Sequence, residues 1–343
     1  MRQKLGSSAV RGMRLEKFSE FARILDPRKK FSEVSQEIEV RVDPLTGGVS
    51  RVNLARGLRP KQEIKVEAPI QPDCPFCPQN IDRETPKFPE DFVREGRIKR
   101  GRATIFPNLY PLADLHGVCV FTDAHKLELD KFSKEELMDG FKASVDFFRM
   151  GAEMGAIFHF LGWNHLPNAG ASILHPHFQL IASKMGLRAE RELFEACERY
   201  WRRNERSYWS DLEEERYSER YVGENDGIMW VAPWAPLGAY EVLGFSTQGV
   251  SSLTEFGEKG IEAFSEGIVR ILRGLWNLGV RAVNMAVYSF PDRREWFSLH
   301  ARIMARPSGS TTDRAFLEIY GSEVGLTAPP EAYAKILRSY FKV

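Results

Sequence analysis

Two stretches of this chain follow the same order of predicted elements, and this repetition constrains the fold more than any other feature. The first contains a strand in GVCVFTD, a helix begun by a Ser133–Glu136 capping box, and strands in AIFHFLGWN and HPHFQLIAS. The second contains a strand in AYEVLGFST, a helix over Leu253–Trp276, and strands in VNMAVYSFP and FSLHARIMA. We therefore predict a duplicated α+β unit, because each copy shows strand alternation and helical periodicity in the same order.

The repeat divides the chain into four predicted parts. Residues 1–40 form a charged extension with a mostly helical pattern, and residues 41–186 hold the first unit. Residues 187–220 are dense in charge and predict a helical, solvated connector, and residues 221–343 hold the second unit. At the start of the first unit, EIEVRVDPLTGGVSRVNLA alternates on both sides of a glycine-containing turn, which predicts a β-hairpin.

Composition and charge argue against several classes of protein. The chain has 343 residues, of which 43% are hydrophobic and 28% charged, as in ordinary globular proteins. A formal net charge of +1 gives no global attraction to nucleic acid or acidic membranes, and no apolar run is long enough to span a bilayer. The N-terminus lacks the apolar block of a secretory signal, and four cysteines do not form a disulfide framework. We therefore expect a cytoplasmic protein.

The strand HPHFQLIAS carries three polar side chains on one face. Because side chains alternate along a strand, His175, His177 and Gln179 share one side, while Phe178 lies on the other. A single histidine is often a structural residue, but three aligned polar groups each need a partner, which favours the floor of a polar pocket. Superposing the last strands of the two units places Ser298, His300 and Arg302 opposite these three residues.

A Cys-x-x-Cys motif, Cys74-Pro-Phe-Cys77, precedes the first unit's strands. Its spacing suits a zinc site or a dithiol redox motif, and its loop-forming flanks QPD and PQN favour the metal, since the redox motif needs a strand before it and a helix after it. Two further ligands are then required. His125, at the end of a strand, and His175 are the candidates, so we predict a structural zinc site formed by Cys74, Cys77, His125 and His175.

With His175 on the metal, His177 is left free for chemistry. A neutral imidazole with one nitrogen bonded to a backbone carbonyl presents its other nitrogen as a nucleophile toward phosphorus. Gln179 can donate a hydrogen bond to a phosphate oxygen, but an amide does little to activate water. The pattern therefore predicts a covalent phospho-histidine and transfer to an acceptor other than water.

From about Arg41 to the C-terminus the chain resembles the galactose-1-phosphate uridylyltransferases of the histidine-triad superfamily. The family's His-Pro-His-Gly-Gln motif appears as His175-Pro176-His177-Phe178-Gln179, and Phe178 in place of glycine is expected to crowd the nucleotide side. The resemblance implies duplicated histidine-triad-like units, each with a mostly antiparallel half-barrel sheet flanked by helices. It implies that His177 becomes uridylylated, that Gln179 holds the transferred phosphate, and that the four predicted metal ligands match the family's zinc site.

Other family positions match more loosely. By resemblance, the phosphate-contacting residues are Asn164, Gly170 and Ser172, the phosphate-binding arginines are Arg56 and Arg59, and the uridine pocket includes Asn108 and Tyr110. Phe316 and Tyr320 match a hexose-contacting tail, in which Ala315 and Gly321 replace a Lys and a Glu. Some members also bind iron through one Glu and three His. Glu192 and His300 match two of these positions but Arg302 replaces a third ligand, so we do not expect iron.

The resemblance implies a ping-pong enzyme that works as a homodimer. In its reaction UMP passes from a UDP-hexose to a hexose-1-phosphate through uridylyl-His177. The altered tail leaves a second reading open, a nucleotide-sugar phosphorylase that uses inorganic phosphate or an ADP-sugar. A histidine-triad hydrolase is disfavoured because that group commonly has a third histidine where Gln179 stands. A non-enzymatic zinc module leaves the His177 and Gln179 face unexplained.

Overall fold

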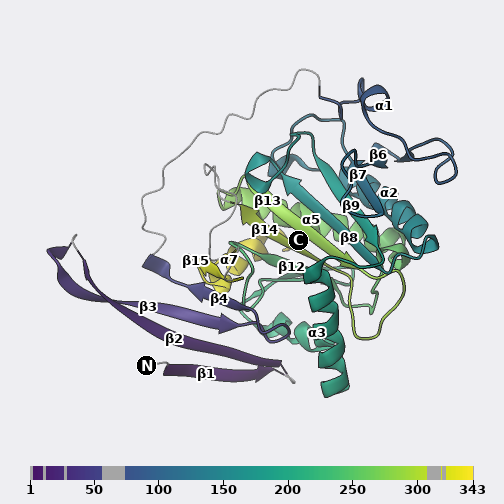
Figure 1. The fold of residues 1–343 in the computed structure, drawn as a ribbon. Coiled ribbons are helices and arrows are strands. Elements are labelled where there is room, and N and C mark those ends of the chain that lie inside the picture. Colours follow the sequence, from purple (N-terminus) through teal and green to yellow (C-terminus); the bar gives the residue numbers. More distant parts are fainter. Residues whose placement is uncertain are drawn as a thin grey trace.

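A large antiparallel sheet forms the body of the molecule (Figure 1). It has ten strands and consists of two halves with the same strand order. The structure, a computed structural model, describes residues 3–10, 13–26, 29–55, 74–306, 318 and 322–342. From its outer edge to the centre, the first half contains β5 (Ile98–Arg100), β6 (Ala103–Pro107), β7 (Leu115–Val120), β9 (His177–Ser183) and β8 (Phe158–His165). The second half contains, in the same sense, β10 (Tyr221–Asn225), β11 (Ile228–Val231), β12 (Val242–Ser246), β14 (His300–Arg306) and β13 (Ala282–Ser289).

The two halves join at the centre of the sheet, where β8 pairs with β13. The pairs run from His165 opposite Val283 to His159 opposite Ser289. In each half, one long helix separates the third strand from the fourth along the chain: α2 (Lys134–Glu153) and α5 (Gly257–Asn277). The duplicated α+β unit is therefore confirmed. The boundaries of the four parts stay a prediction, since one continuous sheet spans both units.

Helices α2 and α5 cover the same face of the sheet and bury the main core. Ser133 accepts a hydrogen bond from the Glu136 backbone while the Glu136 side chain bonds back to Ser133, which is the capping box predicted there. The apolar stripe of α2 packs with that of α5 against alternate residues of both halves, including Leu161, Phe178 and Ala301. The opposite face of the sheet is thereby left to form the site.

Helices α3 (Arg188–Asn204) and α4 (Tyr208–Leu212) lie against that opposite face, over the second half. Much of the segment predicted as a connector is helical, but the prediction that it is solvated is wrong. Leu193, Phe194 and Cys197 recur at helical spacing and pack with Trp209 on β11 and β12. Charge density therefore describes only the outer face of α3, whose arginines and glutamates pair at i,i+4.

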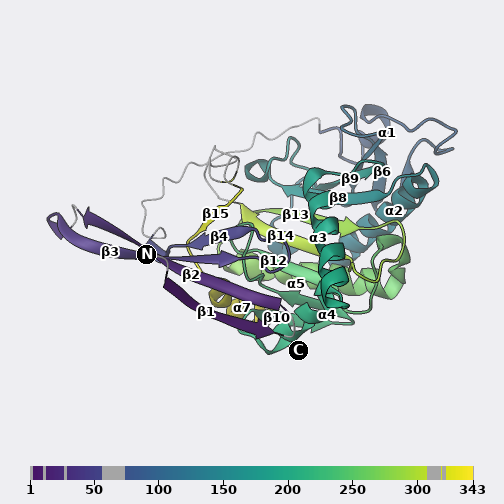
Figure 2. The ribbon, with the colours of Figure 1, turned by 60° about the horizontal axis from the view of Figure 1, so that its bottom comes forward.

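The N-terminal residues form strands, so the helical pattern predicted for residues 1–40 is wrong. A second sheet has the order β1 (Gln3–Val10), β2 (Met13–Asp26), β3 (Ser32–Val42), β4 (Val49–Val52) and β15 (Val324–Leu326) (Figure 2). The charges pair across neighbouring strands, as in Lys17–Glu39 and Arg23–Glu33, so cross-strand pairing outweighs helical propensity. The predicted hairpin is confirmed, because β3 and β4 pair antiparallel around Asp43–Gly48.

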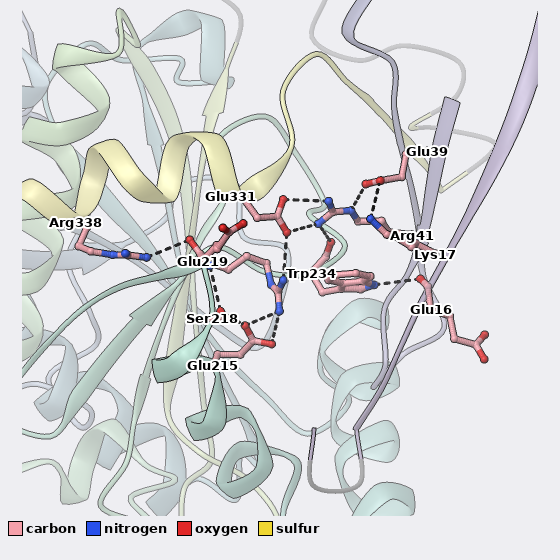
Figure 3. Close-up of polar contacts among 11 residues, drawn as sticks. Glu16, Lys17, Glu39, Arg41, Glu215, Ser218, Glu219, Trp234, Glu331 and Arg338 are labelled. Atoms are coloured by element: carbon pink, nitrogen blue, oxygen red, sulfur yellow. Dashed lines mark hydrogen bonds and ion pairs between the residues drawn. The ribbon is translucent and has the colours of Figure 1, made fainter. Parts of the chain in front are cut away.

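A buried cluster of charges fixes this second sheet to the body (Figure 3). Arg41 and Arg220 lie over the Trp234 ring, with guanidinium carbons 4.5 and 4.8 Å from its centroid. Glu331, in α7 (Pro330–Leu337), accepts hydrogen bonds from both arginines, and Glu215 pairs with Arg220. Each arginine is thus neutralised, and the cluster is a structural joint between β3, the second half and α7.

Within the described ranges, no helix is both long and apolar enough to cross a membrane.

Candidate active site and metal centre

Strand β9 places the candidate catalytic residues on the face opposite the main core. Phe178, Leu180 and Ala182 point into the core beneath α2, so His177 and Gln179 point to the other side. Phe178 is fully buried and stacks on Phe121 with ring centroids 4.2 Å apart. The expectation that Phe178 crowds the nucleotide side is therefore wrong. Its ring fits over Gly140 of α2, where an added Cβ would lie 2.9 Å from it.

The four predicted metal ligands come together from three separate segments. One donor atom each from Cys74, Cys77, His125 and His175 lies within 4.8 Å of the others. Cys77 Sγ is 3.5 Å from His125 Nδ1 and 3.7 Å from His175 Nδ1. With Zn–S of about 2.3 Å and Zn–N of about 2.0 Å, a tetrahedral S···N edge is roughly 3.5 Å. The donors therefore suit a tetrahedral metal ion.

The surroundings of the cluster also favour a metal over a redox dithiol. His175 Nε2 donates to the Thr122 carbonyl at 2.7 Å, which leaves Nδ1 unprotonated and available as a ligand. A redox Cys-x-x-Cys motif needs a thiol pKa lowered by a helix N-terminus. Here burial and the neighbouring Cys74 raise the pKa of Cys77, and the short helix α1 (Ile81–Glu84) begins only after a further turn.

His177 has the hydrogen bond that its proposed chemistry requires. Its Nδ1 donates to the backbone carbonyl of His175 at 2.8 Å, so Nε2 carries the lone pair. The side chain is buried, with the Phe76 ring edge-on at 5.1 Å between centroids. Burial lowers the pKa of His177, which keeps the imidazole neutral. The ring of His175 belongs to the cluster of candidate metal ligands. The carbonyl of the same residue therefore connects that cluster to His177.

Gln179 contacts one residue that was predicted to belong to the site and one that was not. Its Oε1 lies 3.2 Å from Asn108 Nδ2 and 2.8 Å from His116 Nε2. His116 was not predicted as a site residue. Its contact depends on β7 pairing with β9, which places His116 opposite Ile181, and no local pattern reveals that neighbour. Tyr110 lies beyond Asn108 with 81% of its surface exposed.

A cavity of about 510 Å³ lies beside this strand, over β8, β13 and β14. The first half contributes Gly162, Asn164 and Gly170, of which the last two were predicted phosphate contacts. The second half contributes Asn284, Tyr288 and Arg302, none of which was predicted to bind substrate. Gly170 has φ of +92°, a conformation that glycine adopts without strain. Ser172 is exposed in the bend that leads to β9.

Four predicted contacts lie outside the described residues. They are Arg56, Arg59, Phe316 and Tyr320.

The positions compared with an iron site hold an ion pair. Arg302 Nη1 donates to Glu241 at 2.9 Å, and the Glu241 side chain is fully buried. Glu192 pairs with Arg188 on the surface of α3, and His300 stacks on Tyr288. An arginine is always charged and donates only, so it cannot serve as a metal ligand. The donor set does not fit iron.

No protein-family model matches the chain. A protein of Archaeoglobus fulgidus described as uncharacterized is 29% identical over 334 residues, which cover 95% of this chain and 98% of that protein. An ADP-glucose phosphorylase from Arabidopsis thaliana, solved with bound ADP-glucose, superposes with a TM-score of 0.71 at 17% identity. That alignment covers 88% of this chain and 98% of the phosphorylase. The chain has the same fold.

Two further solved structures agree with this result. A galt-like protein from Arabidopsis thaliana has a TM-score of 0.69 at 17% identity, over 87% of this chain and 98% of that one. A uridylyltransferase has a TM-score of 0.67 at 20% identity, over 88% of this chain and 98% of that one. The α+β fold expected from the family resemblance is therefore confirmed, with its large antiparallel sheet flanked by helices.

Proposed function

We propose that the chain is a nucleotidyltransferase that acts on nucleotide sugars through a covalent nucleotidyl-His177 intermediate. The observation that carries this proposal is the orientation of His177, whose Nδ1 is held by a carbonyl so that Nε2 is the nucleophile. His177 shares the polar face of β8 and β9 with Gln179 and Asn164, and this face and the fold shared with the uridylyltransferase support the proposal.

The first step exchanges one phosphorus bond for another. His177 Nε2 attacks the α-phosphorus of a UDP-hexose, the P–N bond forms, and the P–O bond to the departing hexose-1-phosphate breaks. The positive charge that develops on the imidazole is shared through Nδ1–H with the His175 carbonyl. In the second step, an oxygen of an incoming hexose-1-phosphate attacks the same phosphorus and the P–N bond breaks.

The site residues then have distinct roles. Gln179, Asn164, Gly170 and Ser172 would contact the phosphates together with Arg56 and Arg59, Asn108 would border the uridine, and Phe316 and Tyr320 would contact the hexose. A zinc ion held by Cys74, Cys77, His125 and His175 would tie the Cys74 loop to β9 and fix the carbonyl that orients His177. We also infer a homodimer, as in the family that the sequence resembles.

A second candidate is a nucleotide-sugar phosphorylase that uses the same His177. The superposition on an ADP-glucose phosphorylase favours it. In that reaction an adenylyl-His177 intermediate forms from an ADP-sugar, and inorganic phosphate attacks it to release ADP.

Intact-mass spectrometry after acid-free quenching tests both candidates. We expect UDP-glucose to add one UMP to the protein, and a chase with galactose-1-phosphate, but not with inorganic phosphate, to remove it. Labelling by ADP-glucose and removal by inorganic phosphate would establish the phosphorylase instead. The proposed mechanism fails if neither sugar nucleotide labels the protein, or if the adduct survives His177→Ala.

A further inference from the structure

Two side-chain amides, those of Gln179 and Asn164, lie beside His177 on the site face of the sheet. Gln179 follows on the same strand, and Asn164 succeeds Trp163, the β8 residue that pairs with Phe178. An amide presents either an oxygen, which only accepts hydrogen bonds, or an NH2 group, which only donates. A bound phosphoryl group only accepts. The site therefore attracts the phosphoryl group where an amide turns its NH2 group to it, and repels the phosphoryl group where an amide turns its oxygen to it.

A backbone N–H that contacts His116 determines the direction of the Gln179 amide, because His116 in turn contacts Gln179. The Leu112 N–H points at His116 Nδ1 at 3.1 Å, and a backbone N–H can only donate. His116 Nδ1 must therefore be unprotonated, so a neutral His116 carries its proton on Nε2. That nitrogen lies 2.8 Å from Gln179, so the atom of Gln179 facing it is the oxygen.

Asn108 leads to the same result independently. The Tyr110 N–H donates to Asn108 Oδ1 at 2.8 Å, which leaves the Asn108 NH2 group to face Gln179 at 3.2 Å. Two donors thus converge on Gln179 Oε1. Burial lowers the pKa of His116, so its imidazole stays neutral at neutral pH and keeps this proton arrangement.

The second half of the molecule orients Asn164 in the same way. Asn284 Nδ2 lies 2.8 Å from the Ala169 carbonyl, an atom that can only accept, which identifies this end of Asn284 as its NH2 group. The same group lies 2.7 Å from Asn164 Oδ1. The Asn164 NH2 group is turned away from Asn284 and toward Gly170. A Cβ added to Gly170 would lie 3.6 Å from Asn164 Nδ2.

We propose that His116 and Asn284 are positioning residues that hold the oxygens of Gln179 and Asn164, so that both NH2 groups face the transferred phosphoryl group. This assignment rests on the proposed function for its chemical consequence. The arrangement supplies two neutral donors whose direction is fixed before substrate binds, so no reorientation is needed when charge develops on the phosphoryl oxygens. It also assigns the second half a part in the chemistry, through Asn284.

Variants of His116 separate orientation from packing. His116→Phe keeps an aromatic ring at this position but removes the Nε2–H that donates to Gln179. Gln179 is then free to turn its oxygen to the site. We expect adduct formation with the productive sugar nucleotide to slow roughly ten- to hundredfold in single turnovers, the range of a hydrogen bond to a charged group. His116→Gln places an NH2 group near the former Nε2 and should restore the rate to within a few-fold of wild type. Asn284→Leu should slow adduct formation in the same way as His116→Phe.

His159→Phe is the matched control, because His159 is a buried histidine stacked on Phe148 in the core, away from the site. It should form the adduct at the wild-type rate. Wild-type rates in His116→Phe, or equal losses in His116→Phe and His116→Gln at unchanged melting temperature, would overturn the proposal.

Nitrogen-15 NMR of His116 tests the orientation without catalysis. We expect the neutral form with its proton on Nε2, and a proton on Nδ1 would refute the proposal even in an active enzyme. If wild-type protein forms no adduct with either sugar nucleotide, the proposed function fails. The orientation is then judged by the NMR result and by titration with inorganic phosphate, which should bind wild type and His116→Gln more tightly than His116→Phe; equal binding by all three would refute it.

Discussion

His177 begins β9 and His300 begins β14, and these two strands occupy equivalent positions on either side of the centre of the sheet. Both rings donate from Nδ1 to the carbonyl two residues before them, at 2.8 Å in each case. Both are buried. The backbone geometry that orients His177, the proposed nucleophile, is therefore present twice.

The surroundings of the two histidines differ. The Tyr288 ring stacks on His300 with centroids 4.9 Å apart, and the Trp209 ring lies tilted against it at 4.3 Å. His300 Nε2 is buried without a hydrogen-bond partner in the described part of the chain. Ser298 stands in place of His175, a candidate metal ligand, and donates a hydrogen bond to the Ser246 carbonyl. Arg302 replaces Gln179 and pairs with Glu241. A carbonyl that orients the histidine is therefore not enough to form a site. A site like that proposed for the first half also needs open space beside the histidine, a strand whose beginning is held in place, and hydrogen-bond donors that face outward.

The comparison predicts its largest effect for removal of each histidine. His177→Ala should reduce nucleotidyl adduct formation more than about 10³-fold, because the covalent route is lost. His300→Ala should reduce stability but leave the rate per folded molecule within a few-fold of wild type. Single-turnover mass spectrometry with folded protein measured by circular dichroism distinguishes the two. Comparable loss of rate in both variants would show that the halves act together.

The second-largest predicted difference between the two halves concerns the metal site. Cys74→Ser removes one of four ligands, so we expect metal content to fall from one zinc per chain and the unfolding free energy to fall by about 4 kcal/mol or more, as when a structural metal is lost. Ser298→Ala, at the equivalent of His175, should leave metal content unchanged. Elemental analysis and urea unfolding measure both quantities. Full zinc content and unaltered unfolding in Cys74→Ser would contradict the assignment of the ligands.

The ion pair of the second half gives the third effect. Arg302→Met leaves the Glu241 carboxyl in a site where burial already raises its pKa, and it should cost roughly 3 kcal/mol in urea unfolding. The double change Arg302→Met with Glu241→Gln removes the uncompensated charge and should recover most of that loss. If the double variant is no more stable than Arg302→Met, the pair does not support this half through its charge.

Whether the sequence reveals a given part of this contrast depends on how far apart along the chain the interacting residues lie. The faces of HPHFQLIAS, the capping box at Ser133 and the Cys74–Cys77 pair follow from short spacings and are predictable. His125 and His175 are far from that pair in the sequence and were chosen as candidates that also match the family's zinc site. The contacts Asn284–Asn164 and His116–Gln179 are not predictable, because they depend on which strands become neighbours.

The failed expectations have the same origin. The pattern of residues 1–40 fits a helix locally, but partners on β3 and β4 turn it into strands. Trp209 belongs to a segment whose charges suggest solvent, and it covers His300 because α4 packs on the second half. At the N-terminus the deciding partners are the next strands along the chain, and for Trp209 the partner lies in a distant segment.

The smallest predicted effect is the pH dependence that His300 contributes to the stability of the second half. Burial lowers the pKa of His300 to about 3, below the value of about 6.5 for an unfolded histidine. The folded state therefore binds fewer protons than the unfolded state, so the stability from this group is complete above pH 6.5 and is lost as pH falls toward 3. Between pH 8 and pH 5 the loss is roughly 2 kcal/mol.

His300→Phe should remove this contribution while keeping an aromatic ring against Trp209 and Tyr288. The unfolding free energy of wild type relative to His300→Phe should therefore fall by roughly 2 kcal/mol between pH 8 and pH 5. Tyr288→Phe alters the same packing but keeps the imidazole, so it should retain the wild-type pH dependence. Parallel urea titrations of the three proteins at both pH values measure this. An unchanged difference between wild type and His300→Phe would mean that His300 is protonated in the folded state, despite the aromatic rings that exclude water from it.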